Sequence, residues 1–297
     1  MIVPLLKNRG RSCAPRSRYR DLLRRRRHGA GAGWPADAGA PGGLRAAWRP
    51  RQRPQRLQAR LLPLAERMQL VYIDHRGQGR SAKGDPERYN LDENVEDLEA
   101  LRQYLGLGPI VSIGTSYGGM VAMAHAARYP DSVSHLVCVV TAAHSGFMPR
   151  AQQIVAERGT PEQQRVCDML WNGELDTLEK VQHYYDVMGP LYSTTYDPQR
   201  SKDGRARTLH APEALNRAFR PGGFLRSYDL RPELPKITAK TLVLGGAHDW
   251  ICAPEFSREI HELIPGSDLR IFANSSHSIR ADEPEAMMDA IKGFIVY

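Results

Sequence analysis

One serine, one aspartate and one histidine each follow an apolar run, and together they could form a nucleophilic site. Ser116 comes directly after the apolar run 110–113, Asp249 follows 240–246, and His277 follows 269–272. A serine hydroxyl is a strong nucleophile only when a base takes its proton, and that base works best when an acid holds it in place. The candidate catalytic residues are therefore Ser116 as nucleophile, His277 as base and Asp249 as acid.

Ser116 lies in the pattern Gly-Thr-Ser-Tyr-Gly-Gly at 114–119, between an apolar run and an Ala-rich run that stops at Pro130. A strand, a tight turn and a helix around Gly-x-Ser-x-Gly are typical of a nucleophile elbow. Glycines on both sides of the serine make room for the turn. The helix start offers the backbone N–H of Tyr117 to a developing negative charge. An ordinary serine in a glycine-rich connection is the alternative that this stretch alone leaves open.

The acid and the base also have simpler interpretations. Asp249 could cap a loop, and His277 could be an ordinary polar loop residue. His248 competes for the role of the base, but it is next to Asp249 in the sequence, so we expect its side chain to point elsewhere. Other histidines lack motif context, and we expect them to be solvated or structural: His125, His135, His144, His183, His210 and His261.

The elements around these residues predict an α/β fold. Apolar strands at 69–73, 110–113, 134–141, 240–246 and 269–272 alternate with helical patterns, which indicates a mostly parallel sheet with helices on both faces. The carboxyl ends of such strands meet at one edge of the sheet, where ligands bind. Between 146 and 228 the alternation stops and three helical patterns follow one another. We expect a helical insertion there, lying over that edge.

The charge of the chain is divided unevenly along its length. The formal net charge is +8, but residues 1–60 hold 16 basic and 2 acidic residues, and the rest of the chain holds 25 basic and 31 acidic ones. The body of the protein is therefore mildly acidic, and the net charge gives no reason to expect nucleic-acid binding. No apolar run approaches the length of a membrane span.

Residues 1–56 have no sustained helical or strand period and are rich in Arg, Pro and Gly. Such a composition buries too little apolar surface to offset the entropy of the chain, so we expect poor order. Three interpretations compete: a basic tail, an organelle-targeting segment, or the product of a shifted reading frame in a GC-rich gene. We favour the third, because an element that should precede residue 57 is missing, as described below.

Taken together, the motifs resemble the α/β hydrolases and, within them, the proline-iminopeptidase-like branch. The resemblance rests on Asp-x-Arg-Gly-x-Gly-x-Ser at 74–81, the elbow at 114–119, Gly-Ala-His-Asp at 246–249, and Ser-His at 276–277 with Glu-Pro at 283–284. It covers about residues 57–297. It implies the same triad of Ser116, Asp249 and His277, and it implies that Gly119 lets the helix pack closely on its strand.

The chain departs from that family in one place. Such enzymes usually carry a His-Gly-Gly-Pro-Gly type loop after an early strand, which supplies an oxyanion N–H. No apolar strand is recognisable before residue 57, so the Tyr117 N–H remains as the expected oxyanion donor.

The resemblance implies four segments: an atypical, poorly ordered segment 1–56, a first core part 57–145, a helical cap 146–228, and a second core part 229–297. The expected function is a serine hydrolase that forms an acyl-enzyme on a small amide or ester. An aminopeptidase of the proline-iminopeptidase type, with a short peptide or small molecule as substrate, is the specific expectation. The alternatives are a carboxylesterase, lactonase or carbon–carbon-bond hydrolase with the same triad, and a catalytically impaired protein that lacks the oxyanion loop.

Several features are left open or expected only in outline. Glu174, Asp176 and Glu179 in the helical insertion could bind a substrate amine, but the sequence cannot choose among them, so the substrate-binding residues are unknown. No metal or organic cofactor is implied. The four cysteines are widely scattered and form no CxxC pair, which favours a reducing compartment and hence the cytoplasm. The oligomeric state is not indicated.

Overall fold

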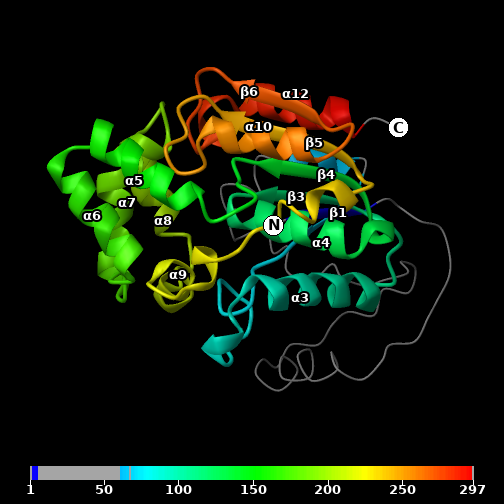
Figure 1. Ribbon diagram of the computed structural model, residues 1–297, viewed down its shortest axis with the longest axis horizontal. Helices are drawn as coiled ribbons and strands as arrows, with labels where there is room; N and C mark the ends of the chain where they lie inside the picture. Colours follow the sequence, from blue (N-terminus) through cyan, green and yellow to red (C-terminus); the bar gives the residue numbers. More distant parts are fainter. Residues whose placement is uncertain (1, 6–60, 67, 296–297) are drawn as a thin grey trace.

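The computed structural model describes residues 2–5, 61–66 and 68–295 (Figure 1). Within them one sheet runs in the order β2-β1-β3-β4-β5-β6. The strands are β1 (Ile2–Leu5), β2 (Gln69–Tyr72), β3 (Ile110–Thr115), β4 (Val133–Val139), β5 (Lys240–Gly246) and β6 (Asp268–Phe272). The strands β3 to β6 are mutually parallel, so their carboxyl ends share one edge.

Both faces of this sheet are covered, because successive side chains of its strands point to opposite sides. Leu136 and Cys138 of β4 pack into one apolar cluster with α3 (Leu91–Tyr104), α4 (Tyr117–Arg128) and α10 (Pro254–Leu263). Val137 and Val139 pack into a second cluster with η1 (Leu62–Glu66) and α12 (Pro284–Phe294). The predicted α/β class, a mostly parallel sheet with helices on both faces, is confirmed.

Between β4 and β5 the described chain forms five α-helices and no strand of the sheet. It forms α5 (Phe147–Arg158), α6 (Pro161–Asn172), α7 (Leu178–Tyr192), α8 (Pro198–Arg205) and α9 (Pro212–Phe219). A capping box begins α6, where the side chains of Thr160 and Gln163 each bond the backbone of the other. Helices α5 to α8 form a group beside the sheet (Figure 1). The short turns η2 (Pro86–Arg88), η3 (Pro130–Ser132), η4 (Phe224–Arg226) and η5 (Leu234–Lys236) and the helix α11 (Ile279–Asp282) complete the elements.

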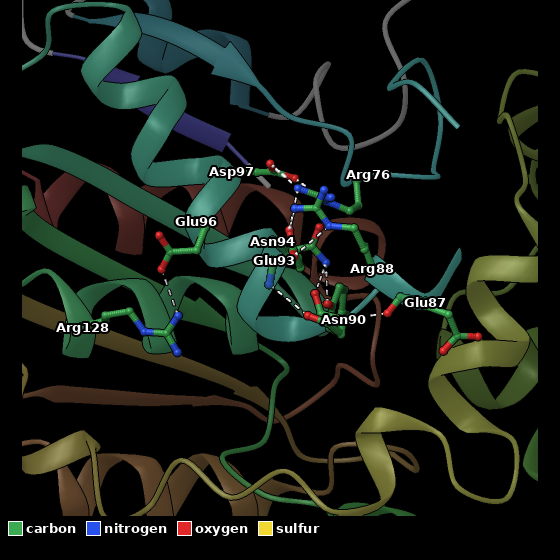
Figure 2. Close-up of polar contacts among 10 residues, drawn as sticks. Arg76, Glu87, Arg88, Asn90, Glu93, Asn94, Glu96, Asp97 and Arg128 are labelled. Carbon is green, nitrogen blue, oxygen red and sulfur yellow. Dashed lines mark hydrogen bonds and ion pairs between the residues drawn. The ribbon is translucent and has the colours of Figure 1, made fainter. Parts of the chain in front are cut away.

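Ion pairs hold the loop after β2 against α3 (Figure 2). The Arg76 guanidinium donates to both carboxylate oxygens of Asp97, at 2.8 and 2.6 Å, and lies 2.9 Å from Glu93. Arg88 reaches the same Glu93 carboxylate at 2.6 Å. The start of α3 is fixed by the side chain of Asn90, which accepts from the Glu93 N–H at 2.9 Å. The loop 74–81 is thereby anchored beside the helix that packs on α4.

The strand β1 overturns the expectation that no strand precedes residue 57. It lies between β2 and β3 and runs antiparallel to both, with Ile2 opposite Tyr72 and Ile113. The run is only four residues long and contains Pro4, so it gives almost no pattern in the sequence. Without a strand at this position, the facing edges of β2 and β3 would carry unpaired backbone groups. The remaining expectations for 1–56, and the start of the predicted helix at 57–60, lie outside the described residues.

None of the helices in the described residues has both the length and the apolar character needed to span a membrane.

Candidate active site

Ser116 has the strained backbone that a nucleophile elbow requires. Its φ is 53° and its ψ is −125°, a conformation that costs a residue with a side chain about 1–3 kcal/mol. Two bonds to the end of β4 hold it there. The Ser116 N–H donates to the Val139 carbonyl at 2.9 Å, and its carbonyl accepts from the Thr141 hydroxyl at 2.8 Å. The hydroxyl group makes no capping bond to α4, so it is available for chemistry.

Two glycines make this turn possible, in different ways. A Cβ at Gly114 would collide with the carbonyl oxygen of Gly118, so β3 and the first turn of α4 can approach only when residue 114 is glycine. A Cβ at Gly119 would lie 2.7 Å from Cβ of Thr141. Gly119 therefore allows close packing against the residues after β4, the neighbouring strand, rather than against its own strand β3.

Asp249 and His277 form a buried pair. Asp249 is 1% exposed and His277 is 7% exposed, and Oδ2 of Asp249 lies 2.8 Å from Nδ1 of His277. The other oxygen, Oδ1, accepts from the backbone N–H groups of Ile251 and Cys252, each at 3.0 Å. With Oδ1 occupied by these two backbone donors, Oδ2 accepts from the ring, so Nδ1 carries the proton and Nε2 is free to accept one.

Close contacts between the segments that follow β5 and β6 keep Asp249 and His277 together. The Ala247 N–H donates to the Phe272 carbonyl and the His248 N–H to the Ser275 carbonyl, both at 3.0 Å. A Cβ at Gly246 would collide with the carbonyl oxygen of Ser276 and lie 2.8 Å from that of Ser275. Only glycine at this position lets the loop that carries His277 approach the acid.

The competing histidines lie elsewhere. The side chain of His248 is exposed while that of Asp249 is buried, so the acid contacts His277 and not its sequence neighbour. The buried His125 binds Glu99 at 3.0 Å, and His144 pairs with Glu259 at 3.1 Å. These contacts fit the structural roles expected for the histidines without a motif.

The structure places all three candidates at the carboxyl edge of the sheet, in the segments that follow β3, β5 and β6. It joins two of them directly: within the described residues the Ser116 hydroxyl makes no hydrogen bond to His277. Catalytic hydrogen bonds are often long before substrate binds and tighten in the complex. The geometry thus contains an oriented acid–base pair and a strained serine on the same edge.

An aromatic ring whose position the sequence analysis did not predict lies against His277. The ring of Tyr192, at the end of α7, packs edge-on against His277 with centroids 5.6 Å apart and against Trp250 at 5.3 Å. The hydroxyl groups of Tyr192 and Tyr184 lie 2.9 Å apart. Burial raises the pKa of Tyr192 well above its usual value, so the ring stays neutral. In the sequence, Trp250 comes directly after Asp249, and this was the signal that could have placed an aromatic residue near the site.

Tyr117 has two parts with different surroundings. As the first residue of α4 its N–H has no intrahelical partner, which suits the expected oxyanion donor. Its hydroxyl accepts from Nδ2 of Asn94 at 2.7 Å, and its ring packs against His75 at 5.2 Å and Phe224 at 5.7 Å. Burial lowers the pKa of His75 to about 3, so this ring is neutral near pH 7. Sequence analysis did not anticipate that His75 lies against the elbow.

A second oxyanion donor is not evident where the resemblance would place it. The strand beside β3 that should lead into such a loop is here β1, which runs the opposite way and starts at the site edge with Ile2 level with Ile113. Among the described residues no loop therefore follows a parallel strand at this position.

The three carboxylates considered for a substrate amine lie on the surface. Glu174, Asp176 and Glu179 are all exposed, and Asp176 pairs with Lys180 at 2.8 Å. None of them gains support as a buried binding group.

Comparisons with known proteins show the family to which the chain is similar. A family model described as the alpha/beta hydrolase fold matches residues 41–284. A proline iminopeptidase PfmaB of Pestalotiopsis fici is 28% identical over 239 residues, covering 78% of this chain and 83% of the relative. A proline iminopeptidase of Saccharolobus solfataricus is 29% identical over 251 residues, covering 79% of each.

Solved structures show the same fold. The proline iminopeptidase of Mycobacterium smegmatis matches with a TM-score of 0.64 at 22% identity, covering 80% of this chain and 84% of that one. An esterase from Exiguobacterium antarcticum matches with a TM-score of 0.61 at 21% identity, covering 80% and 86%. The family model and the relatives together support a hydrolase.

Proposed function

Because the chain belongs to the α/β-hydrolase family, we propose that it is a serine hydrolase that forms an acyl-enzyme on a small amide or ester. The observation that carries the proposal is the buried hydrogen bond of 2.8 Å between Asp249 and His277, on the same sheet edge as the strained Ser116. An imidazole held by a carboxylate, on the same sheet edge as a serine elbow, is the arrangement that activates a hydroxyl for acyl transfer.

In the proposed reaction Nε2 of His277 takes the proton of the Ser116 hydroxyl as Oγ attacks the substrate carbonyl carbon. The tetrahedral oxyanion faces the Tyr117 N–H. The C–N or C–O bond then breaks, His277 protonates the departing amine or alcohol, and the acyl group stays on Ser116. Water, deprotonated by His277, then attacks the acyl carbon. The bond between this carbon and Oγ breaks, His277 returns the proton to Oγ of Ser116, and the acid leaves. Asp249 remains ionised throughout and stabilises the imidazolium.

For the substrate we propose an N-terminal aminoacyl group, with proline as the first candidate. The support is the two relatives named proline iminopeptidases at 28% and 29% identity. The ring of Tyr192 packs against His277 and is only partly buried, and it offers an apolar group that suits a compact ring. We also propose that residues 146–228 act as a cap between the core parts 57–145 and 229–297. The three described cysteines are free thiols, which favours the cytoplasm.

An esterase or lactonase is the second candidate, because the same nucleophile attacks esters. Among the solved structures of this fold are the esterase from E. antarcticum and an enol-lactonase from Burkholderia xenovorans. An impaired protein is the third candidate, since no described residue replaces the oxyanion loop. Loss of one oxyanion donor costs on the order of 10²–10³ in rate.

A substrate panel separates these candidates. Purified protein and Ser116→Ala are assayed with prolyl and alanyl arylamides and with short-chain p-nitrophenyl esters. An aminopeptidase cleaves the prolyl arylamide with the highest kcat/KM, an esterase cleaves only the esters, and an impaired protein cleaves neither. Turnover that persists in Ser116→Ala would contradict the proposed nucleophile.

A further inference from the structure

Asp282, at the end of α11, bonds two segments that lie far apart in the sequence. Its Oδ1 accepts from the hydroxyl group of Ser193, and from the N–H and hydroxyl group of Thr195 at 3.2 and 3.0 Å. Its Oδ2 accepts from the N–H of Ser276 at 3.0 Å. One carboxylate thus holds the chain that leaves α7 and the residue that precedes His277.

Further bonds join the same two segments. The Ser276 hydroxyl donates to the Leu191 carbonyl at 2.6 Å and contacts the His248 carbonyl at 3.1 Å. The Thr194 hydroxyl donates to the Asn274 carbonyl at 2.5 Å. Tyr192, whose ring packs on His277, lies within the joined stretch. A shift of residues 191–195 would therefore move groups on both sides of the imidazole.

The neighbouring carboxylate, Glu283, does not join these two segments as Asp282 does. Oε2 of Glu283 accepts from the Asn274 N–H at 3.1 Å and from the Ser275 hydroxyl at 2.7 Å. Both partners belong to the loop that carries His277, so Glu283 shapes this loop locally. Only Asp282, of these two, also accepts from residues that follow α7.

We propose that Asp282 is a positioning residue that couples the helical segment 147–226 to the orientation of His277. The carboxylate is suited to this because it only accepts hydrogen bonds, and each of its oxygens faces donors from a different segment. An asparagine of the same shape cannot serve both sides, since its NH₂ group must face donors on one of them. The proposal rests on the proposed function insofar as it takes His277 as the catalytic base.

The test compares Asp282→Asn with Thr195→Val, which removes one donor on the α7 side without touching the His277 loop. Thr208→Val is the matched control, because the Thr208 hydroxyl bonds only within its own segment, to the Gly204 carbonyl at 3.0 Å. The readouts are the rate of labelling by a fluorophosphonate, kcat and KM, and the NMR signal of the His277 Nδ1 proton.

We expect Asp282→Asn to lower kcat and the labelling rate by about 10²-fold, the effect of a misplacement of about 1 Å, with a much smaller change in KM. Thr195→Val should lower both rates about 3- to 10-fold, roughly the value of one lost hydrogen bond, and shift the His277 signal. Thr208→Val should match the wild type in all readouts.

The proposal is overturned if Thr195→Val leaves the labelling rate and the His277 signal unchanged, because Asp282 would then serve its own loop only. The comparison with Thr195→Val decides the proposal even if Asp282→Asn does not fold. If instead the proposed function fails, the wild type itself will not be labelled at Ser116. The NMR signal of His277 would then still report whether Thr195 and the imidazole are coupled.

Discussion

Replacing Asp249 by asparagine should disable the base while leaving the fold intact. In the wild type Oδ1 accepts from two backbone N–H groups, of Ile251 and Cys252, and Oδ2 accepts from Nδ1 of His277. The asparagine oxygen must stay with the two backbone donors, because turning the NH₂ group toward them would leave both unpaired at about 1–3 kcal/mol each. The NH₂ group therefore faces Nδ1, which must become the acceptor.

With Nδ1 as acceptor, the proton moves to Nε2, and His277 can no longer take the proton of Ser116. We expect kcat/KM on the best substrate to fall by about 10⁴-fold, the loss found when a triad histidine is held in the wrong tautomer. The thermal midpoint should change little, and the NMR signal of the Nδ1 proton should disappear. Asp268→Asn, at an exposed carboxylate that begins β6, is the matched control. Activity of Asp249→Asn within tenfold of the wild type would refute this account of the acid.

Three further perturbations test other parts of the structure. Gly246→Ala should push the His277 loop away from Asp249, since the new Cβ would collide with the Ser276 carbonyl. We expect the free energy of unfolding to fall by about 1–3 kcal/mol, the cost of overpacking, and labelling by fluorophosphonate to slow. Labelling at the wild-type rate would contradict the geometry. Burial raises the pKa of Glu99, but hydrogen bonds from Arg102, Gln103 and His125 outweigh this effect and lower the pKa to about 2. The stabilisation that ionised Glu99 gives the fold is therefore present above pH 4.5 and is lost as the pH falls toward 2. Glu99→Gln should thus lose about 1–3 kcal/mol at pH 7 and progressively less below pH 4.5 in urea unfolding; a deficit independent of pH would refute the assignment. If the reading frame of residues 1–56 is shifted, the coding DNA upstream of codon 57 should encode, in another frame, an apolar strand followed by a His-Gly-rich loop. Restoring that frame should raise the rate of hydrolysis at least about 10²-fold. The absence of such a frame from the DNA would favour a genuine tail.

The sheet and the elbow were predictable because they depend on local patterns. Apolar runs bounded by glycine and proline predicted β2 to β6, and Gly114 and Ser116 predicted the turn before α4. The order of Ser116, Asp249 and His277 along the chain, with each residue after a strand, was sufficient to place all three on one edge, because parallel strands end together.

Other features depend on contacts between distant segments and could not be predicted. The strand β1 is too short to give a periodic signal, and its pairing with β2 and β3 joins segments far apart in the sequence. The bonds of Asp282 to Ser193 and Thr195 join residues almost 90 positions apart, which no spacing rule describes. The contact of Tyr192 with His277 likewise follows from where α7 ends in space.

The most direct test of the central claim is the identification of the residue that a fluorophosphonate labels. Purified protein is treated with the probe, digested, and its peptides are measured by mass spectrometry, alongside Ser116→Ala and His277→Gln. We predict a single adduct on Ser116 in the wild type, none in Ser116→Ala, and strongly slowed labelling in His277→Gln. An adduct on another residue, or labelling that Ser116→Ala does not abolish, would contradict the assignment of Ser116 as the nucleophile.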